Sequence, residues 1–235
     1  MLSSRPPSWC FGPILFGIGL IHSRSISKVS KKLSTLLVAS VQVFSLSFPL
    51  CISKHHTSWA YPKNLISLSV VFGMNDVYDY HSDVTNSRKL GSGLEGAVLY
   101  PVYHPSVRLA AYISTVFIVC TSLLTQRFQN VSATGLLVFL AWQYSAPPLR
   151  LKEAPLLDSC SNGLIVLLAW LVGYTFGNGK LSNIPDKAFI LSLCTAGVHA
   201  LGAAVDIDSD SAAGQVTIAT FYGQRSAAAF GASTL

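Results

Sequence analysis

Charged residues are scarce in this chain. Only 11% of its 235 residues are Asp, Glu, Lys or Arg, whereas 51% are hydrophobic. A soluble globular domain carries about 25% charged residues. The shortage excludes a disordered chain and a long coiled coil, and it argues against an ordinary cytosolic enzyme. The composition instead predicts an all-α protein, a polytopic bundle of transmembrane helices whose side chains mostly face lipid or other helices.

Cysteine is also in short supply. The five cysteines are odd in number and widely scattered, with no CxxC pair and no Cys/His spacing typical of zinc. This pattern excludes a secreted disulfide scaffold, and we interpret the cysteines as packing residues. The net charge of +6 comes without a basic stripe interleaved with aromatics. Excess Lys and Arg is typical of loops on the cytoplasmic side of a membrane, so no nucleic-acid partner is expected.

Acidic residues are absent from the first 75 positions of the chain. Six of the ten acidic residues fall in two short segments, 76–83 and 206–210, each at the C-terminal end of a long apolar stretch. Charges on a water-facing surface are not distributed in this way. We therefore predict that the two acidic segments form the functional site.

Seven apolar runs are long enough, or nearly so, to cross a membrane: 9–22, 33–53, 60–80, 107–127, 131–147, 157–177 and 187–207. We expect one transmembrane domain over residues 1–235. Two crossings separate the first acidic segment from the polar loop at 144–152, and two more separate that loop from the second acidic segment. All three polar segments are therefore expected on one side of the membrane.

The acidic segments share a spacing of four residues. On a helix this spacing places Asn75, Asp79 and Asp83 on one face, and it does the same for Asp206 and Asp210. A carboxylate at membrane depth costs on the order of 2.5–3.5 kcal/mol, so two such arrays need a cation. Carboxylate and amide oxygens suit Mg²⁺, which would bridge a diphosphate. The alternative interpretation is that these residues are interfacial caps or loop charges.

The loop at 144–152 carries basic residues directly after a Pro-Pro pair that stops the preceding helix. Arg150 and Lys152 would hold the same diphosphate, Arg as a fork and Lys as a point charge. Ordinary anchoring at the positive side of the membrane is the alternative for both. His199 precedes the second acidic segment; we favour a packing or hydrogen-bonded role for it over a substrate contact.

These segments resemble the motifs of a known family. NDVYDYHSD resembles the N-x-x-x-D-x-x-x-D motif of the UbiA superfamily of intramembrane prenyltransferases, and AVDIDSDSAAG resembles its second motif, D-x-x-x-D. YSAPPLRLK is similar to the family's loop of tyrosine and basic residues, and the order and spacing of the three motifs match over about residues 5–225. The run NDVYDYHSDVTNSRKLGSGLEGAVL is also similar to the lycopene-elongase-like branch.

The resemblance implies a helical bundle with a central cavity open to the membrane. It also implies Mg²⁺-dependent transfer of an isoprenyl group from an allylic diphosphate to a lipophilic acceptor within the bilayer. The implied metal ligands are Asn75, Asp79, Asp83, Asp206 and Asp210, and the four aspartates together with Tyr144 are the implied catalytic residues. The implied diphosphate contacts are Asn75, Arg88, Lys89, Arg150 and Lys152.

Two alternatives follow from the same motifs. A membrane terpene cyclase shares the diphosphate-binding motif and needs no second substrate. The family also carries further helices after its second motif, whereas barely one apolar stretch follows residue 210 here, so we expect the C-terminal helices to be missing. An inactive truncated homologue is therefore the other alternative. As a multi-pass protein it would lie in the endoplasmic reticulum or mitochondrial inner membrane of a eukaryote, or in a bacterial plasma membrane.

Overall fold

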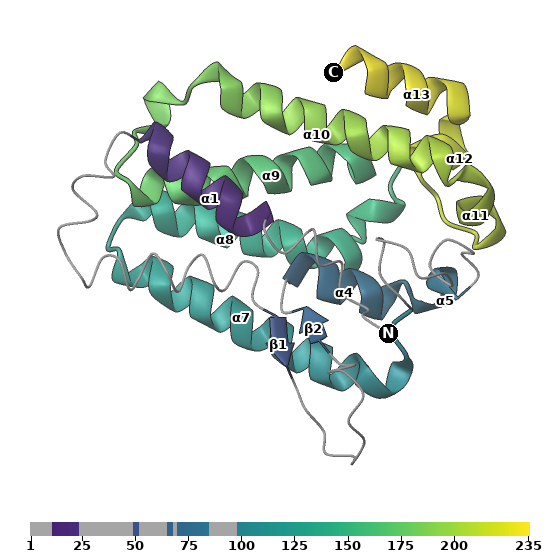
Figure 1. The fold of residues 1–235 in the computed structure, drawn as a ribbon, viewed down its shortest axis with the longest axis horizontal. Helices are drawn as coiled ribbons and strands as arrows, with labels where there is room; N and C mark the ends of the chain where they lie inside the picture. The colour runs from purple at the N-terminus through teal and green to yellow at the C-terminus, as the bar shows by residue number, and fades with distance from the viewer. Residues whose placement is uncertain (1–10, 24–48, 52–64, 68–69, 85–97) are drawn as a thin grey trace.

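The computed structural model describes residues 11–23, 49–51, 65–67, 70–84 and 98–235. Four long helices form its centre: α7 (His104–Leu124), α8 (Phe128–Ser145), α9 (Leu157–Phe176) and α10 (Asp186–Val205). They lie side by side in chain order, each packed against the next (Figure 1). Short connections between consecutive helices favour this antiparallel arrangement.

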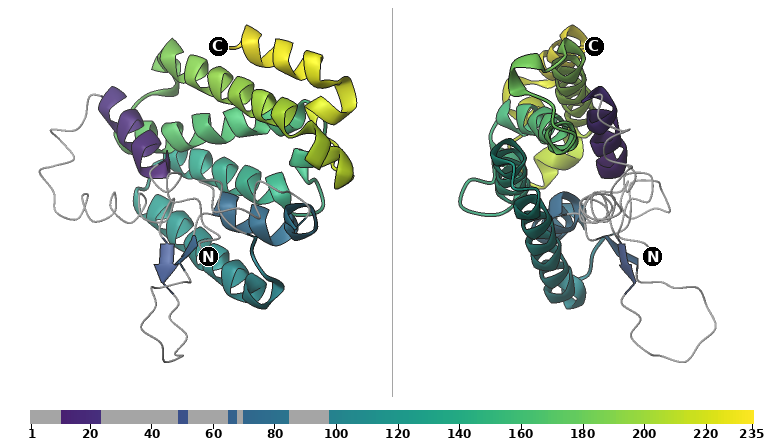
Figure 2. Two further views of the ribbon diagram at one scale, coloured as in Figure 1. Left: turned by 45° about the vertical axis from the view of Figure 1, so that its right-hand side comes forward. Right: turned by 90° about the vertical axis from the view of Figure 1, so that its left-hand side faces the viewer.

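Shorter helices cover this row. Helix α1 (Phe11–His22) packs on α9, and α4 (Val70–Tyr78) packs on α7 and α8. Helix α13 (Gln224–Ser233) runs along α10 at the edge of the bundle opposite α7 (Figure 2). The remaining helices are α5 (Tyr80–Asp83), α11 (Ile207–Ala212), α12 (Ile218–Tyr222), η2 (Pro101–Tyr103), η3 (Leu151–Glu153) and η4 (Leu181–Asn183). Helices α5, α11 and α12 gather at one end of the bundle, at the right of Figure 1.

Two of the predicted membrane spans differ from the structure. Strands β1 (Pro49–Cys51) and β2 (Leu65–Ser67) pair in antiparallel fashion, and they fall inside the runs 33–53 and 60–80 that were expected to be helical. The sequence from Ile66 to Val70 alternates apolar residues with serine, a pattern of period two that favours a strand. Helix α4 has only nine residues and is about 14 Å long, too short to cross a bilayer.

Within the described residues, three helical segments are long and apolar enough to cross a membrane: Pro101–Leu124, Leu157–Phe176 and Asp186–Val205. Their outward faces are apolar and exposed. On α7 these exposed side chains include Leu109, Val116 and Phe117, and on α10 they include Ile190 and Leu193. Such faces suit lipid, because the hydrocarbon region offers no hydrogen bonds to polar side chains.

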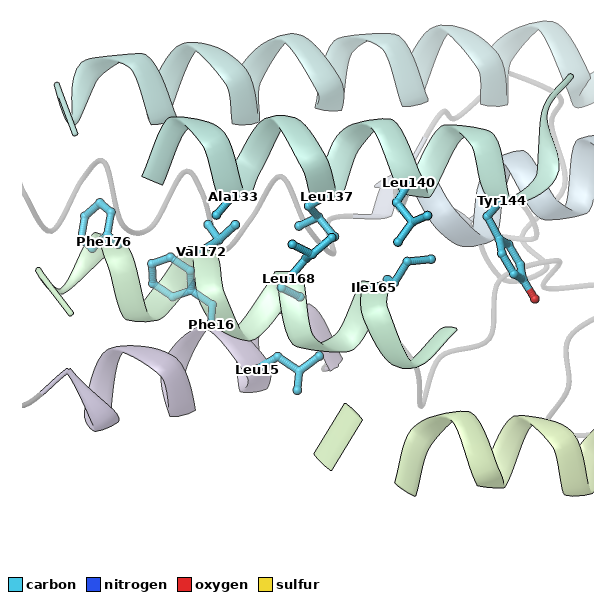
Figure 3. Packing of buried hydrophobic residues seen from close by; sticks show 11 residues of the cluster. Leu15, Phe16, Ala133, Leu137, Leu140, Tyr144, Ile165, Leu168, Val172 and Phe176 are labelled. Carbon is cyan, nitrogen blue, oxygen red and sulfur yellow. The ribbon is translucent and has the colours of Figure 1, made fainter. Parts of the chain in front are cut away.

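The main hydrophobic core lies between α1, α8 and α9 (Figure 3). Ala133, Leu137, Leu140 and Tyr144 form one stripe along α8, because residues three or four apart share a helix face. They meet a matching stripe on α9 that contains Leu168. Tyr144 is the last member of the α8 stripe, and its hydroxyl points away from α8 in Figure 3. The core therefore holds the ring of Tyr144 while its hydroxyl extends beyond the apolar cluster.

Glycines allow α1 and α9 to pack at close range. A Cβ atom at Gly173 would lie 2.0 Å from the carbonyl oxygen of Phe16, and one at Gly19 would lie 2.1 Å from the carbonyl oxygen of Trp170. Neither distance is compatible with a side chain. The backbones of the two helices can approach only because both positions lack one, as is common where membrane helices pack.

We expect Gly173→Ala to lower the free energy of unfolding by about 1–3 kcal/mol, because the added methyl group pushes α1 away from α9. The measurement is denaturant-driven loss of helical circular dichroism in detergent micelles. Gly135→Ala is the matched control, since a Cβ atom there meets nothing within 4 Å. The control should gain up to about 1 kcal/mol from better helix propensity. Equal stabilities of the two variants would contradict the prediction.

Candidate functional site

Each acidic segment contains an aspartate at which a helix is interrupted. Asp79 separates α4 from α5 with φ −97° and ψ 5°, and Asp206 separates α10 from α11 with φ −91° and ψ 7°. Backbone hydrogen bonds nevertheless continue through both breaks. The amide of Asp79 donates to the carbonyl of Asn75 at 2.8 Å, that of Asp83 to Asp79 at 2.8 Å, and that of Asp210 to Asp206 at 2.9 Å. The spacing of four residues therefore still places each set on one side of the chain.

A cavity of about 310 Å³ lies where these two segments meet. Its walls include all five predicted metal ligands: Asn75, Asp79, Asp83, Asp206 and Asp210. Tyr144 at the end of α8 and Lys152 in η3 also line it. The structure therefore brings together three segments that lie far apart in the sequence. The volume is at the lower end of the range for small-molecule sites, about 300–1,000 Å³.

Buried negative charge dominates one wall of this cavity. Asp79 and Asp83 line it and are only 8% and 5% exposed; Asp76, which is not in the lining, is 7% exposed. Among the described residues, Lys152 is the single basic side chain that is equally buried, and its ammonium group forms an ion pair with Asp79. A buried charge is costly unless it is paired. The carboxylate oxygens gathered in the lining are of the kind that a hard cation such as Mg²⁺ accepts as ligands.

The loop between α8 and α9 separates the two basic residues that were expected to act together. Arg150 adopts left-handed backbone geometry with φ 43° and ψ 55°, and its guanidinium pairs with Glu153. The described residues that line the cavity include Lys152 but not Arg150. Burial lowers the pKa of Lys152 to about 8, although the charges of Glu153, Asp76 and Asp210 act in the opposite direction.

Arg88 and Lys89 lie outside the described residues. Among the residues that the structure describes, no three Asp, Glu, His or Cys side chains come close enough to hold a metal ion unaided. The donor set still fits Mg²⁺, which commonly takes one or two carboxylates and completes its shell with phosphate oxygens and water. Each acidic segment would therefore supply only some of the ligands of Mg²⁺, and oxygens of a bound diphosphate would supply others.

A network of polar side chains continues from the cavity into the bundle. The hydroxyl of Tyr144 lies 3.0 Å from Nε2 of His199 and accepts a hydrogen bond from Nδ2 of Asn162 at 2.8 Å. Nδ1 of His199 lies 3.1 Å from the hydroxyl of Ser159. The predicted hydrogen-bonded role of His199 is confirmed, but His199 and Asn162 also line the cavity. The only sequence signal for the α9 partners is that Ser159 and Asn162 are three residues apart, in the mostly polar stretch that opens the predicted run 157–177.

Two further contacts hold the acidic segments in place. Nε2 of Gln215 donates to the hydroxyl of Ser82 at 2.7 Å, and that hydroxyl donates to the carbonyl of Asp79 at 2.9 Å. The fully buried carboxylate of Asp158 accepts a hydrogen bond from the amide of Ile218 at 3.0 Å, at the start of α12. The first contact links the first acidic segment, and the second links α9, to the chain that follows the second acidic segment. Sequence reasoning found neither contact, because both depend on partners distant in the chain.

Comparison with known proteins points to one family. The chain is 31% identical over 236 residues to the lycopene elongase/hydratase of Halobacterium salinarum, covering 97% of this chain and 72% of that protein. It is 33% identical over 161 residues to the C(50) beta-cyclic carotenoids biosynthesis protein LbtBC of Dietzia sp. (strain CQ4). That match covers 68% of this chain and spans 37% of the length of LbtBC. No family model matches the chain.

Solved structures of other proteins share this fold. A UbiA homolog from Archaeoglobus fulgidus bound to DMAPP and Mg²⁺ superposes with a TM-score of 0.71 at 18% sequence identity, covering 98% of this chain and 73% of that one. The same homolog bound to GPP and Mg²⁺ gives a TM-score of 0.69 at 18% identity, covering 98% and 71% of the two chains. The predicted all-helical UbiA-like fold is thereby confirmed, and the sequence relatives place the chain within it. The chain belongs to the family of the lycopene elongase/hydratases, and its fold is that of the UbiA homologs.

Proposed function

We propose that this protein transfers an isoprenyl group from an allylic diphosphate to a lipophilic acceptor of the carotenoid class. The observation that carries the proposal is the single cavity lined by both acidic segments and by Lys152. The relatives named for lycopene support a carotenoid acceptor. The homolog bound to DMAPP and to GPP with Mg²⁺ supports an allylic diphosphate donor and Mg²⁺ as the cofactor.

The two acidic segments would bind the metal ion. Asn75, Asp79 and Asp83 would hold Mg²⁺ on one wall of the cavity, and Asp206 and Asp210 would hold it on the other. When bound, Mg²⁺ neutralises the diphosphate and makes it a leaving group. Charged donors beside a leaving anion stabilise the charge that develops on it.

Lys152 is the lysine among the described residues that line the cavity, and its ammonium group would donate to the diphosphate oxygens. The bond between the allylic carbon and the diphosphate oxygen breaks, and its electron pair leaves with the diphosphate. A double bond of the acceptor then supplies the electron pair for the new carbon–carbon bond. Arg88, Lys89 and Arg150 remain proposed as further diphosphate contacts.

The route of the acceptor follows from the surface of the bundle. The cavity is lined by small or apolar residues, Val71, Gly202 and Ala203, as well as by the acids. The outward faces of α7 and α10 are apolar and exposed. A hydrocarbon acceptor dissolved in the bilayer would therefore approach from the lipid side, while the charged diphosphate stays at the acidic end. The bilayer itself is thus a partner of the reaction.

The test uses purified protein reconstituted in lipid vesicles with DMAPP or GPP as donor, lycopene as acceptor, and Mg²⁺. We expect diphosphate release that depends on lycopene and a product lengthened by one isoprenyl group, with both abolished by EDTA. A cyclic hydrocarbon formed without lycopene would favour the terpene cyclase instead. Monodisperse protein that releases no diphosphate would contradict the proposal and favour an inactive homologue.

A further inference from the structure

We infer that Lys152 competes with Mg²⁺ for the carboxylate of Asp79, so that the cavity binds Mg²⁺ and diphosphate together and the free metal ion only weakly. The inference rests on the proposed function and concerns how its ligands bind. Lys152 would give up the carboxylate of Asp79 to the metal ion and transfer its ammonium group to the diphosphate oxygens. The species that the cavity recognises would thus be the complex of Mg²⁺ with a diphosphate.

The contact that carries this inference is the ion pair between Lys152 and Asp79. The ammonium group of Lys152 contacts Oδ1 of Asp79, and both side chains are buried. Removing one partner from a buried ion pair is strongly unfavourable, because the other charge is left in the protein without compensation. A metal ion that takes over Asp79 must therefore be accompanied by a new anionic partner for Lys152, and a diphosphate provides one.

The ammonium group of Lys152 also lies within the influence of both acidic segments. Burial lowers the pKa of Lys152, and the charge of Glu153 opposes this shift. The charges of Asp76 and Asp210, one from each acidic segment, oppose it as well. A metal ion held by Asp79 would therefore lie close to this ammonium group. Two cations repel each other more strongly in a buried site than in water, because the effective dielectric constant is lower there.

The local structure around Lys152 permits the exchange without a change in the backbone. The amide of Glu153 donates to the carbonyl of Arg150 at 2.9 Å, and the amide of Ala154 donates to the carbonyl of Leu151 at 3.1 Å. The side chains of Arg150 and Glu153 are held by their own ion pair. The flexible stem of a lysine can redirect its ammonium group by rotation of the side chain alone. Lys152 can therefore leave Asp79 while η3 keeps its place.

The exchange couples the binding of the metal ion to the binding of the diphosphate. Free Mg²⁺ must displace the ammonium group of Lys152 from Asp79 and gains nothing in return. With a diphosphate in the cavity, the same displacement gives Lys152 a new partner. Coupling of this kind typically changes affinity by about 5- to 150-fold, and each ligand affects the other equally. A lysine that only stabilised the fold would add nothing to the affinity for diphosphate.

The test measures binding to the purified full chain in detergent, without turnover and without lycopene. The metal probe is Mn²⁺, which accepts the same oxygen ligands as Mg²⁺ and whose free ion is quantified by electron paramagnetic resonance. The second probe is a DMAPP analogue in which sulfur replaces the bridging oxygen to prevent ionisation. We expect Lys152→Met to bind Mn²⁺ alone about 10-fold more tightly than the wild type. At saturating Mn²⁺ the same variant should bind the analogue about 10-fold more weakly.

Two comparisons separate exchange at Asp79 from a general loss of positive charge. Lys187→Met is the matched control, because Lys187 is exposed in the first turn of α10, at the end opposite Asp206. Salt screens a charge at that distance, so both affinities should stay within about twofold of the wild type. In an Asp79→Asn background, Lys152→Met should no longer tighten Mn²⁺ binding, since it releases no carboxylate. If Lys152→Met is not monodisperse in detergent, Lys152→Gln takes its place.

A folded Lys152 variant that binds Mn²⁺ alone no more tightly than the wild type would overturn the inference. Unchanged or tighter binding of the analogue would overturn it as well, because Lys152 would then not contact the diphosphate. Tighter Mn²⁺ binding that persists in the Asp79→Asn background would show a general electrostatic effect and would also overturn the exchange. A wild-type protein that binds neither Mn²⁺ nor the analogue, separately or together, would instead overturn the proposed function and the exchange with it.

Discussion

Replacing Asp206 by Asn is expected to lower kcat/KM for the allylic diphosphate by at least about 1,000-fold, or about 4 kcal/mol of transition-state stabilisation. Asp206 stands at the break between α10 and α11 and lines the same cavity as Asp79. Its replacement would remove one of the two carboxylates, Asp206 and Asp210, that the second acidic segment contributes to this cavity. The cation it helps to hold stabilises charge that develops only as the diphosphate leaves, so the loss should appear mainly in kcat.

The matched control for this variant is Asp208→Asn. Asp208 lies in the same segment but is exposed, and the residues that line the cavity do not include it. Its replacement removes the same charge and should change kcat/KM by less than about threefold. An exposed side chain outside the cavity has no contact with the diphosphate, and its substitution rarely changes stability. The measurement is the initial rate of diphosphate release by both variants over a series of Mg²⁺ concentrations. If both variants lose activity equally, net charge and not metal binding accounts for the effect.

The second large effect concerns Lys152. Lys152→Met should lower kcat/KM for the diphosphate by about 100- to 1,000-fold, the usual cost of removing one donor from a developing anion. The same change leaves the carboxylate of Asp79 buried without its partner, which is costly for stability. Unfolding in detergent should therefore be measured beside the kinetics, so that lost folding is not mistaken for lost catalysis.

The pH dependence provides an independent test of Lys152. Because burial lowers its pKa to about 8, the amine carries its charge below pH 8 and loses it above. At saturating Mg²⁺ we expect kcat/KM to stay level below pH 8 and to fall about tenfold per pH unit above it. Lys152→Arg should remove this fall up to pH ~9.5, because a guanidinium remains charged throughout that range. An identical alkaline fall in the Arg variant would show that another group is responsible.

The membrane class of the protein follows from composition, and the location of its site follows from spacing. Few charges and several long apolar runs exclude a soluble fold whatever the arrangement of the helices. Acids at intervals of four residues share a face of any helix, and this remained true across the breaks at Asp79 and Asp206. The run 60–80 was wrongly predicted to be a single span, because hydropathy does not register the short strand β2 or the break after Tyr78.

Contacts between distant segments could not be predicted in this way. Arg150 and Lys152 follow the same Pro-Pro pair, and the sequence gives no reason to expect different partners for them. In the structure, Arg150 has left-handed backbone geometry and pairs with Glu153, whereas Lys152 pairs with Asp79. From the sequence alone, His199 is one polar residue in a predicted apolar helix. Its place in the cavity depends on how α10 is rotated against α8 and α9.

The sequence by itself determined that the chain folds into apolar helices, and it predicted that the two acidic segments form one site. Composition and four-residue spacing are local properties, so they hold in any packing of the helices. Only the tertiary structure decided which basic residue faces the acids and that Tyr144 meets His199 and Asn162. The reason is physical: helices that are apolar on nearly every side carry no polar stripe to set their rotation, so close packing alone selects which side chains meet.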